Sequence, residues 1–160
     1  MEAKNILIEE LKAFAEICKE SRQGEFYAQM IKDAKPIKVV PLAEVFTARE
    51  IEHIKNIVHP QAKECYKNAA LVAWLLPQAK YVEGKMTCCK SLGIEHAFNK
   101  VGDKYVDVTM ELALNRVPDE EEYISLGEWE GGEILDAFEK TGCYGDMYAI
   151  SLRNKLSTKL

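Results

Sequence analysis

The pair Gly102-Asp103 constrains the fold of this chain more than any other short stretch, because it separates two strand-like runs, residues 95–101 and 104–109. A glycine–aspartate pair between two such runs is a strong signal for a β-hairpin with a two-residue loop. In such a hairpin, directly opposite residues have numbers that sum to 205. The sequence therefore predicts both the hairpin and its register.

This register brings a histidine and an aspartate together. His96 faces Thr109, and Asp107 faces Phe98, and paired residues lie on the same face of a sheet. His96 and Asp107 are then diagonal neighbours with Cα atoms about 7–8 Å apart, within reach of an imidazole–carboxylate hydrogen bond. A loop one residue longer or shorter would place them on opposite faces.

A buried helix is predicted just before the hairpin. Residues 64–76 contain no glycine or proline, are rich in alanine and leucine, and stop at Pro77. From residue 69 to 76 the segment is apolar on all sides, which is typical of a helix buried on most of its faces. Cys65 lies in the first turn, and we expect the second face of the hairpin, formed by Ala97, Val106 and Val108, to cover this helix or another layer.

The rest of the chain gives a coarser pattern. Thr47 to Glu50 has the capping-box pattern that starts a helix. We expect helices over residues 3–20, 26–31, 47–58, 64–76 and 132–140, with a break at Gly24. We expect extended segments at 36–40 and 80–84, a connecting loop at 85–93, and a strand or helix at 144–152. For residues 123–129 an amphipathic surface loop is preferred over a segment that covers one side of a cleft.

A length of 160 residues and 48% hydrophobic residues predict one globular domain over residues 1–160. We divide it into a mainly helical part (1–58), a core that carries the candidate chemistry (60–110) and a C-terminal completion (111–160). The net charge of −5 and the lack of a Lys/Arg cluster argue against a nucleic-acid partner. The acidic run from Asp119 to Glu122 is typical of a solvated turn or helix start.

The five cysteines bear on localisation and on metal binding. The first residues contain no basic region followed by an apolar one, and no run approaches the ~18 apolar residues of a membrane span, so we expect a cytoplasmic protein with reduced thiols and no membrane partner. Cys88-Cys89 with His96 suggests zinc, but adjacent cysteines chelate poorly and no Cys-x-x-Cys pair is present. We expect no metal or cofactor, and the vicinal pair is interpreted as incidental, or else as redox-active or as part of a loop that closes the site.

Cys65, His96 and Asp107 together have the composition of a nucleophile, a base and an orienting carboxylate. A carboxylate on one ring nitrogen fixes the imidazole tautomer and leaves the other nitrogen free to act as base. The positive end of a helix dipole favours thiolate over thiol in the first turn. This is the general arrangement for acyl transfer through a covalent thioester.

The same stretches resemble the core of the papain-like superfamily, most closely its transglutaminase-like branch. The resemblance covers residues 60–110, and its motifs are Glu64-Cys65-Tyr66-Lys67-Asn68-Ala69, Tyr81-Val82-Glu83-Gly84, Glu95-His96-Ala97-Phe98-Asn99 and Tyr105-Val106-Asp107-Val108-Thr109. It implies an α+β fold in which a central buried helix packs on an antiparallel β-sheet, here with additional N-terminal helices.

The sequence departs from the family pattern on both sides of the cysteine. Glu64 and Tyr66 stand where members often have a small residue and a tryptophan, and a carboxylate beside Cys65 would oppose thiolate formation unless it points to solvent. An oxyanion hole needs the Cys65 N–H and one more donor, for which Gln61, one turn upstream, is the candidate. The other interpretation of Gln61 is an ordinary loop residue.

Two main functions follow from these observations. The first is a cysteine-dependent hydrolase or acyltransferase that acts on an amide, such as a peptide bond, a glutamine side chain or a cell-wall-type peptide. In it Cys65 attacks the carbonyl, His96 moves the proton and Asp107 orients His96. The alternative is a binding or regulatory module that keeps the fold without the chemistry, and a structural role in a larger assembly is a third, weaker idea.

Overall fold

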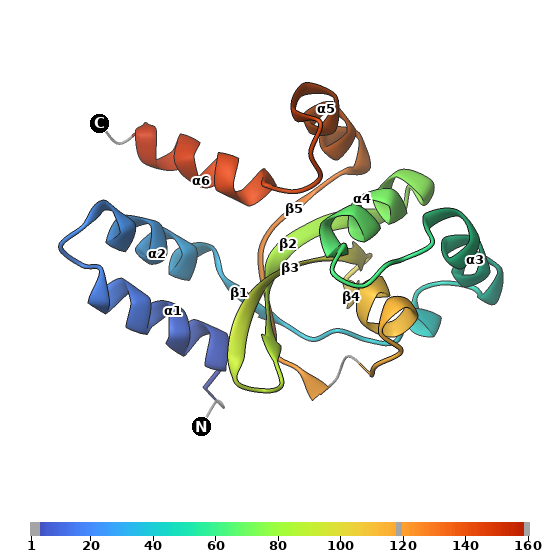
Figure 1. Cartoon of the computed structure of the whole chain (residues 1–160), viewed down its shortest axis with the longest axis horizontal. Helices are drawn as coiled ribbons and strands as arrows, with labels where there is room; N and C mark the ends of the chain where they lie inside the picture. The colour runs from blue at the N-terminus through green and yellow to red at the C-terminus, as the bar shows by residue number, and fades with distance from the viewer. Residues whose placement is uncertain (1–3, 118–119, 159–160) are drawn as a thin grey trace.

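The computed structural model describes residues 4–117 and 120–158, which form an α+β structure around one antiparallel sheet (Figure 1). Residues 1–3 and Asp119, on which parts of the leader and acidic-run predictions fall, lie outside the described residues. The strands are β1 (Lys35–Ile37), β2 (Ala79–Cys88), β3 (Leu92–Val101), β4 (Lys104–Val106) and β5 (Tyr123–Trp129), in the order β1-β5-β2-β3-β4. The helices are α1 (Ile6–Ile17), α2 (Arg22–Asp33), α3 (Ala48–His53), α4 (Cys65–Leu75), α5 (Gly131–Thr141) and α6 (Met147–Ser157), with short helical turns η1 (Leu42–Glu44), η2 (Ile54–Val58) and η3 (Thr109–Ala113).

The sheet is curled, and two features account for the curl. β2 and β5 shift register at a bulge between Glu83 and Gly84, and bulges bend strands. A Cβ at Gly84 would lie 1.9 Å from the carbonyl oxygen of Ile124, so only glycine allows the strands to approach this closely. At the other end, Val39 forms an isolated bridge with Tyr105 of β4, which links the two edges of the sheet.

One apolar cluster packs α4 against the sheet. Ala69, Ala70 and Ala73 of α4 pack against Tyr81 and Ala97. These small side chains let the helix lie close to β2 and β3. The inner side of the curl holds a second cluster, which consists of Val39, Val82, Met86, Phe98, Tyr105, Met110 and Tyr123.

Helices α1, α2 and α6 lie together on one side of the sheet, away from α3 (Figure 1), and α5 packs against α4. Leu7 and Leu11 of α1 pack with Ile124 of β5, and α2 joins the same cluster. Helix α6 lies beside α2, where the Tyr148 hydroxyl donates to the Asp33 carboxylate at 2.7 Å. In the part of the chain that the structure describes, no helix is both long and apolar enough to cross a membrane.

The predicted hairpin and its register are confirmed. Asn99 pairs with Val106, Lys100 with Tyr105 and Val101 with Lys104, all of which sum to the predicted number. The capping box between Thr47 and Glu50 is also present at the start of α3. The predicted helix over 64–76 is α4, and the predicted helix over 132–140 is α5.

Four predictions about secondary structure were wrong. Residues 85–93 are not one loop, because β2 continues to Cys88 and β3 begins at Leu92. Residues 123–129 are not a surface loop but strand β5, which pairs with β1 and β2. The strand predicted over 104–109 ends at Val106, so the predicted pairs Asp107–Phe98 and His96–Thr109 are absent and Thr109 begins η3. Gly24 does not break a helix but lies inside α2, where a Cβ would meet the Cys18 carbonyl oxygen at 2.5 Å.

Candidate functional site

The predicted contact between His96 and Asp107 is present. His96 Nε2 lies 2.7 Å from Asp107 Oδ2, and both side chains are buried, with 4% and 0% of the residue exposed. His96 comes from the middle of β3, and Asp107 follows directly after the last residue of β4. The short loop of the hairpin therefore sets the geometry of the pair.

Asp107 accepts two further hydrogen bonds. The Tyr123 hydroxyl donates to Oδ2 at 2.7 Å, and the Met110 N–H donates to Oδ1 at 3.2 Å. A buried carboxylate is costly unless its oxygens are hydrogen-bonded, and here both oxygens accept. The three donors fix the plane of the carboxylate and hence the orientation of the imidazole.

The surroundings of His96 favour its protonated form. Burial lowers the pKa of His96. The negative charge of Asp107 and the hydrogen bond to it raise this pKa, and a hydrogen bond to Cys65 and the charge of Cys65 raise it further. The result is a pKa raised to about 10. Because Asp107 occupies Nε2, Nδ1 is the ring nitrogen left to exchange protons with a substrate or a thiol.

Cys65 is the first residue of α4 and is half-buried. The preceding Glu64 makes no side-chain capping bond, so the first N–H groups of the helix are free of an N-cap side chain. Such N–H groups have no partner within a helix and carry its positive partial charge. The thiol thus stands beside the imidazole at a helix end that favours negative charge.

Asn68 fixes the approach of the chain to α4. Its side-chain amide donates to the Gln61 carbonyl at 2.8 Å and to Thr109 Oγ1 at 2.9 Å, and its oxygen accepts from the Gln61 N–H at 3.2 Å. One buried amide therefore connects the loop before Cys65 with the turn after Asp107. This connection holds the two halves of the site at a fixed distance.

The structure does not bring the Gln61 side chain to the site. Its amide donates to the backbone carbonyl of His59 at 3.2 Å, and the residue is exposed. The observed contribution of Gln61 is made by its backbone, through Asn68. Its predicted role as oxyanion donor receives no support from this geometry.

Glu64 and Tyr66, which flank Cys65, have different surroundings. The Glu64 side chain is 45% exposed and lies 3.8 Å from the ammonium group of Lys67. It therefore points to solvent, which is the condition under which a carboxylate here is compatible with a thiolate. Tyr66 is partly buried, and Gly145 packs against its ring.

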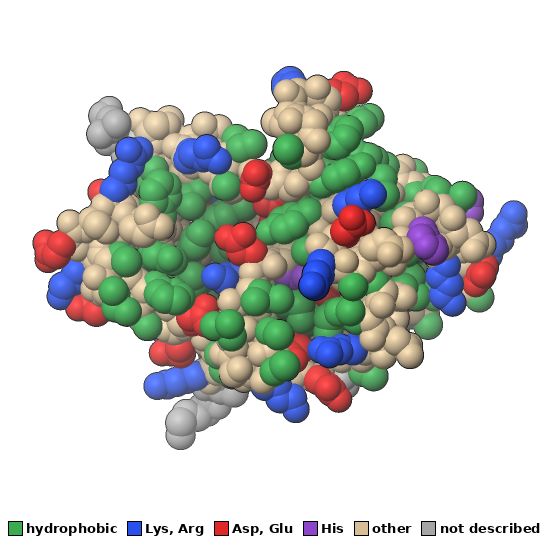
Figure 2. All heavy atoms as spheres, in the orientation of Figure 1, with side chains coloured by type: hydrophobic (Ala, Val, Ile, Leu, Met, Phe, Trp, Pro, Cys, Tyr) green, Lys and Arg blue, Asp and Glu red, His purple; other side chains and the backbone are tan. Residues whose placement is uncertain are grey.

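Cys65 and His96 open into a pocket of about 470 Å³. Its walls are mainly apolar, and Lys63, Arg116, Glu95 and Glu121 add charged groups. The apolar part is formed by Ala62, Tyr66, Met86, Ile94, Met110 and Leu114. Figure 2 shows hydrophobic side chains gathered across the centre of the face in view, with basic and acidic side chains among them. A pocket of this size and polarity suits a small ligand or part of a peptide.

The vicinal cysteines lie on the wall of the same pocket. Cys88 ends β2, and Cys89 follows it with a positive φ of 54° in the turn to β3; both are exposed. Hydrogen bonding to Cys89 and its charge raise the pKa of Cys88. Within residues 4–117 and 120–158, no three His, Cys, Asp or Glu side chains gather as a metal site.

Two residues of the candidate site are not among those predicted from the sequence. Tyr123 lies in the segment for which the sequence favours a surface loop, although tyrosine, isoleucine and tryptophan, all present in residues 123–129, favour strands. Asn68 is a polar residue in an otherwise apolar helix, and a buried amide of this kind needs hydrogen-bond partners. That signal was present in the sequence, but its partners were not identifiable from it.

Comparison with known proteins gave no match: no protein-family model, no curated protein and no solved structure matches the chain.

Proposed function

We propose that this protein is a cysteine-dependent hydrolase or acyltransferase that acts on an amide through Cys65, His96 and Asp107. The observation that carries the proposal is the buried hydrogen bond of 2.7 Å between His96 and Asp107, beside a cysteine at the start of α4. The raised pKa of His96 supports it, because an imidazole that holds its proton at neutral pH stabilises a neighbouring thiolate. The substrate class is a peptide or protein amide.

In the first half of the reaction the Cys65 sulfur attacks the carbonyl carbon and a C–S bond forms. His96 gives its proton from Nδ1 to the amide nitrogen, the C–N bond breaks and the amine leaves. The acyl group stays on Cys65 as a thioester. Asp107 keeps the ring in the orientation that presents Nδ1 and stabilises its positive charge.

In the second half, water or an acceptor amine attacks the thioester carbonyl. His96 takes the proton of the attacking group, the C–S bond breaks and the Cys65 thiolate is restored. Water gives hydrolysis and an amine gives transfer, so the two outcomes share the same residues. During both halves the negative oxygen of the tetrahedral intermediate is stabilised by the Cys65 N–H at the start of α4.

The fold agrees with this proposal at the level of its class. A helix that starts with the cysteine packs on an antiparallel sheet, and the histidine and aspartate lie on or just after adjacent strands. The papain-like superfamily, which the chain resembles most closely in its transglutaminase-like branch, has the same arrangement. We propose membership in this superfamily as the interpretation of the fold.

Competitive labelling tests the proposal. Iodoacetamide at limiting concentration should modify Cys65 at least about tenfold faster than Cys18, which is half-buried like Cys65 but has no histidine partner among the described residues. Mass spectrometry of the digested protein measures both rates in one sample. His96→Gln should remove the difference, and in Cys18→Ala, the control variant, the labelling rate of Cys65 should stay at its wild-type value.

A second assay separates an enzyme from a binding module. A library of peptide amides is incubated with the wild type and with Cys65→Ala, and release of amine or ammonia is measured. Turnover by the wild type alone supports the enzyme. Equal labelling of Cys65 and Cys18 would contradict the proposal and favour a binding module that keeps the fold.

A further inference from the structure

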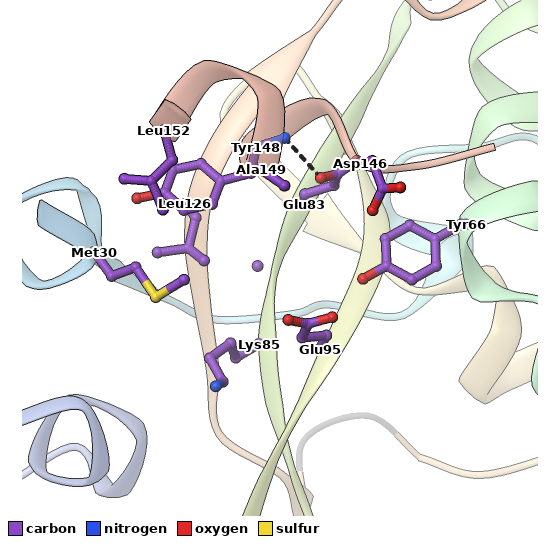
Figure 3. Close-up of a pocket in the computed structure, with 11 residues that line it drawn as sticks. Met30, Tyr66, Glu83, Lys85, Glu95, Leu126, Asp146, Tyr148, Ala149 and Leu152 are labelled. Carbon is purple, nitrogen blue, oxygen red and sulfur yellow. Dashed lines mark hydrogen bonds between the residues drawn. The ribbon is translucent and has the colours of Figure 1, made fainter. Parts of the chain in front are cut away.

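A second cavity, of about 110 Å³, lies next to the catalytic pocket (Figure 3). Tyr66, which follows Cys65, and Glu95, which precedes His96, line both the cavity and the pocket. These two residues therefore lie between the cavity and the Cys65–His96 pair. It lies where α2, α4 and α6 meet β2, β3 and β5, and Glu95 and Asp146 on its wall are exposed residues. A substrate held at Cys65 could therefore extend into this cavity.

The two sides of the cavity differ in chemistry. One side is apolar and is formed by Met30, Leu126, Ala149 and Leu152. The other side carries the Tyr66 hydroxyl and the carboxylates of Glu95 and Asp146, and Figure 3 shows the hydroxyl directed towards Glu95. An apolar wall opposite an acidic one is complementary to a side chain with an aliphatic stem and a cationic end.

The carboxylates of the cavity are not equivalent. Glu83 is buried, and its oxygens already accept hydrogen bonds from Tyr81 and from the N–H groups of Met147 and Tyr148. Glu95 and Asp146 have no hydrogen-bond or ion-pair partner among residues 4–117 and 120–158. These two are therefore the carboxylates that remain available to a ligand.

Lys85 is the one basic residue on the cavity wall within the described residues. It lies opposite Glu95 in the β2–β3 ladder, yet no ion pair joins them, and Figure 3 shows its amino group turned away from the Glu95 carboxylate. The cavity therefore keeps a negative potential. The pKa of Tyr66 agrees: burial raises it first, and the charges of Glu95, Glu83, Cys65 and Asp146 raise it further.

We propose that this cavity is a specificity subsite that binds a lysine or arginine side chain of the substrate, with Glu95 and Asp146 as the recognising carboxylates. The inference rests on the proposed function, because it places the basic side chain next to an amide held at Cys65. Met30, Leu126 and Leu152 contact the aliphatic stem, and Tyr66 supplies an aromatic ring and a hydroxyl close to the cationic group. The enzyme then prefers peptides with a basic residue near the reacting amide.

The test uses bromoacetyl dipeptide amides, which alkylate cysteine, with lysine at the first or second position and norleucine as its uncharged substitute. The second-order rate of Cys65 modification is measured by intact-mass spectrometry. At least one lysine probe should react about threefold to tenfold faster than its norleucine partner, and the preference should shrink in high salt. Equal rates for lysine and norleucine at both positions would overturn the subsite.

Asp146→Asn assigns the preference to the cavity. Asparagine tolerates the left-handed backbone that Asp146 adopts at φ 61°, so the substitution preserves the start of α6. It should lower the ratio of the lysine rate to the norleucine rate towards one. Glu139→Gln, which removes the same charge from an exposed position of α5, is the matched control and should retain the full preference.

Iodoacetamide distinguishes the two ways to fail, because it is too small to use the subsite. If iodoacetamide labels Cys65 no faster than Cys18, the proposed function fails and takes the subsite with it. If iodoacetamide labels Cys65 selectively but lysine gives no advantage, or Asp146→Asn and Glu139→Gln behave alike, the subsite alone is wrong.

Discussion

The two buried carboxylates of the sheet, Asp107 and Glu83, are built from nearly the same parts. Asp107 accepts from the Tyr123 hydroxyl and from a backbone N–H in the turn η3. Glu83 accepts from the Tyr81 hydroxyl at 2.6 Å and from two N–H groups at the start of α6. In each case a tyrosine and a helical start compensate for the burial of a negative charge.

The difference between them is the cation. Asp107 contacts the His96 imidazole, whereas Glu83 contacts no basic side chain within the described residues, and burial raises the pKa of Glu83. Glu83 holds α6 to the sheet, while Asp107 holds an imidazole beside a thiol. The same kind of buried carboxylate, bound by a tyrosine and by backbone N–H groups, thus forms a candidate reactive site only where a histidine and a cysteine lie beside it.

The largest effect is expected for Asp107→Asn. Loss of the carboxylate removes the charge that keeps His96 protonated and oriented, so amide turnover should fall by a factor on the order of 10³ or more. Iodoacetamide labelling of Cys65 at pH 7 should slow in parallel. In Glu83→Gln, the matched change at the other carboxylate, labelling should stay within about twofold of the wild type. Similar losses in both variants would break the comparison.

The titration of His96 tests whether Asp107 controls the charge of the imidazole. Because the pKa of His96 is raised from 6.5 to about 10, the folded state binds its proton more tightly than the unfolded chain. The resulting stabilisation is complete below about pH 6.5 and is lost as pH rises towards 10. NMR of the ring should show a protonated imidazole at pH 8 in the wild type. In Asp107→Asn burial is opposed only by Cys65, so the pKa of the ring should fall well below its wild-type value, and an unchanged titration would refute the role of Asp107.

Glu83→Ala should affect stability rather than chemistry. It leaves a tyrosine hydroxyl and two N–H groups without their acceptor, which costs roughly 2–4 kcal/mol of unfolding free energy. Urea unfolding measures the loss, and hydrogen exchange at Met147 and Tyr148 locates it at the start of α6. Iodoacetamide labelling of Cys65, measured where the variant is folded, should stay close to the wild-type rate. A loss of labelling as large as that of Asp107→Asn would show that the two carboxylates are not separable.

The local parts of the candidate site were predictable from the sequence. The two-residue loop at Gly102-Asp103 fixes the register, and the register places His96 beside Asp107. The apolar segment that stops at Pro77 predicts a helix, and Cys65 lies in the first turn of that helix. These relations involve residues close together in the chain, where turn and helix rules are strongest.

The long-range parts were not predictable. Tyr123 reaches Asp107 only because β5 enters the sheet between β1 and β2, and nothing in residues 123–129 specifies that neighbour. Asn68 contacts Thr109, 41 positions away. Gln61 lies at the predicted spacing from Cys65, but its side chain binds the nearer His59 carbonyl. Tertiary packing decides each of these contacts.

Tyr123 and Tyr81 allow Asp107 and Glu83 to be compared through the loss of a single hydroxyl group. Tyr123→Phe and Tyr81→Phe each remove one buried hydroxyl from one carboxylate, and each should cost about 1–2 kcal/mol of unfolding free energy. Only Tyr123→Phe frees an oxygen that His96 also uses, so it alone should slow iodoacetamide labelling of Cys65, by about threefold to tenfold. Tyr81→Phe should match it in urea unfolding and leave labelling within about twofold. Equal effects on labelling would mean that Tyr123 acts through general packing and not through Asp107.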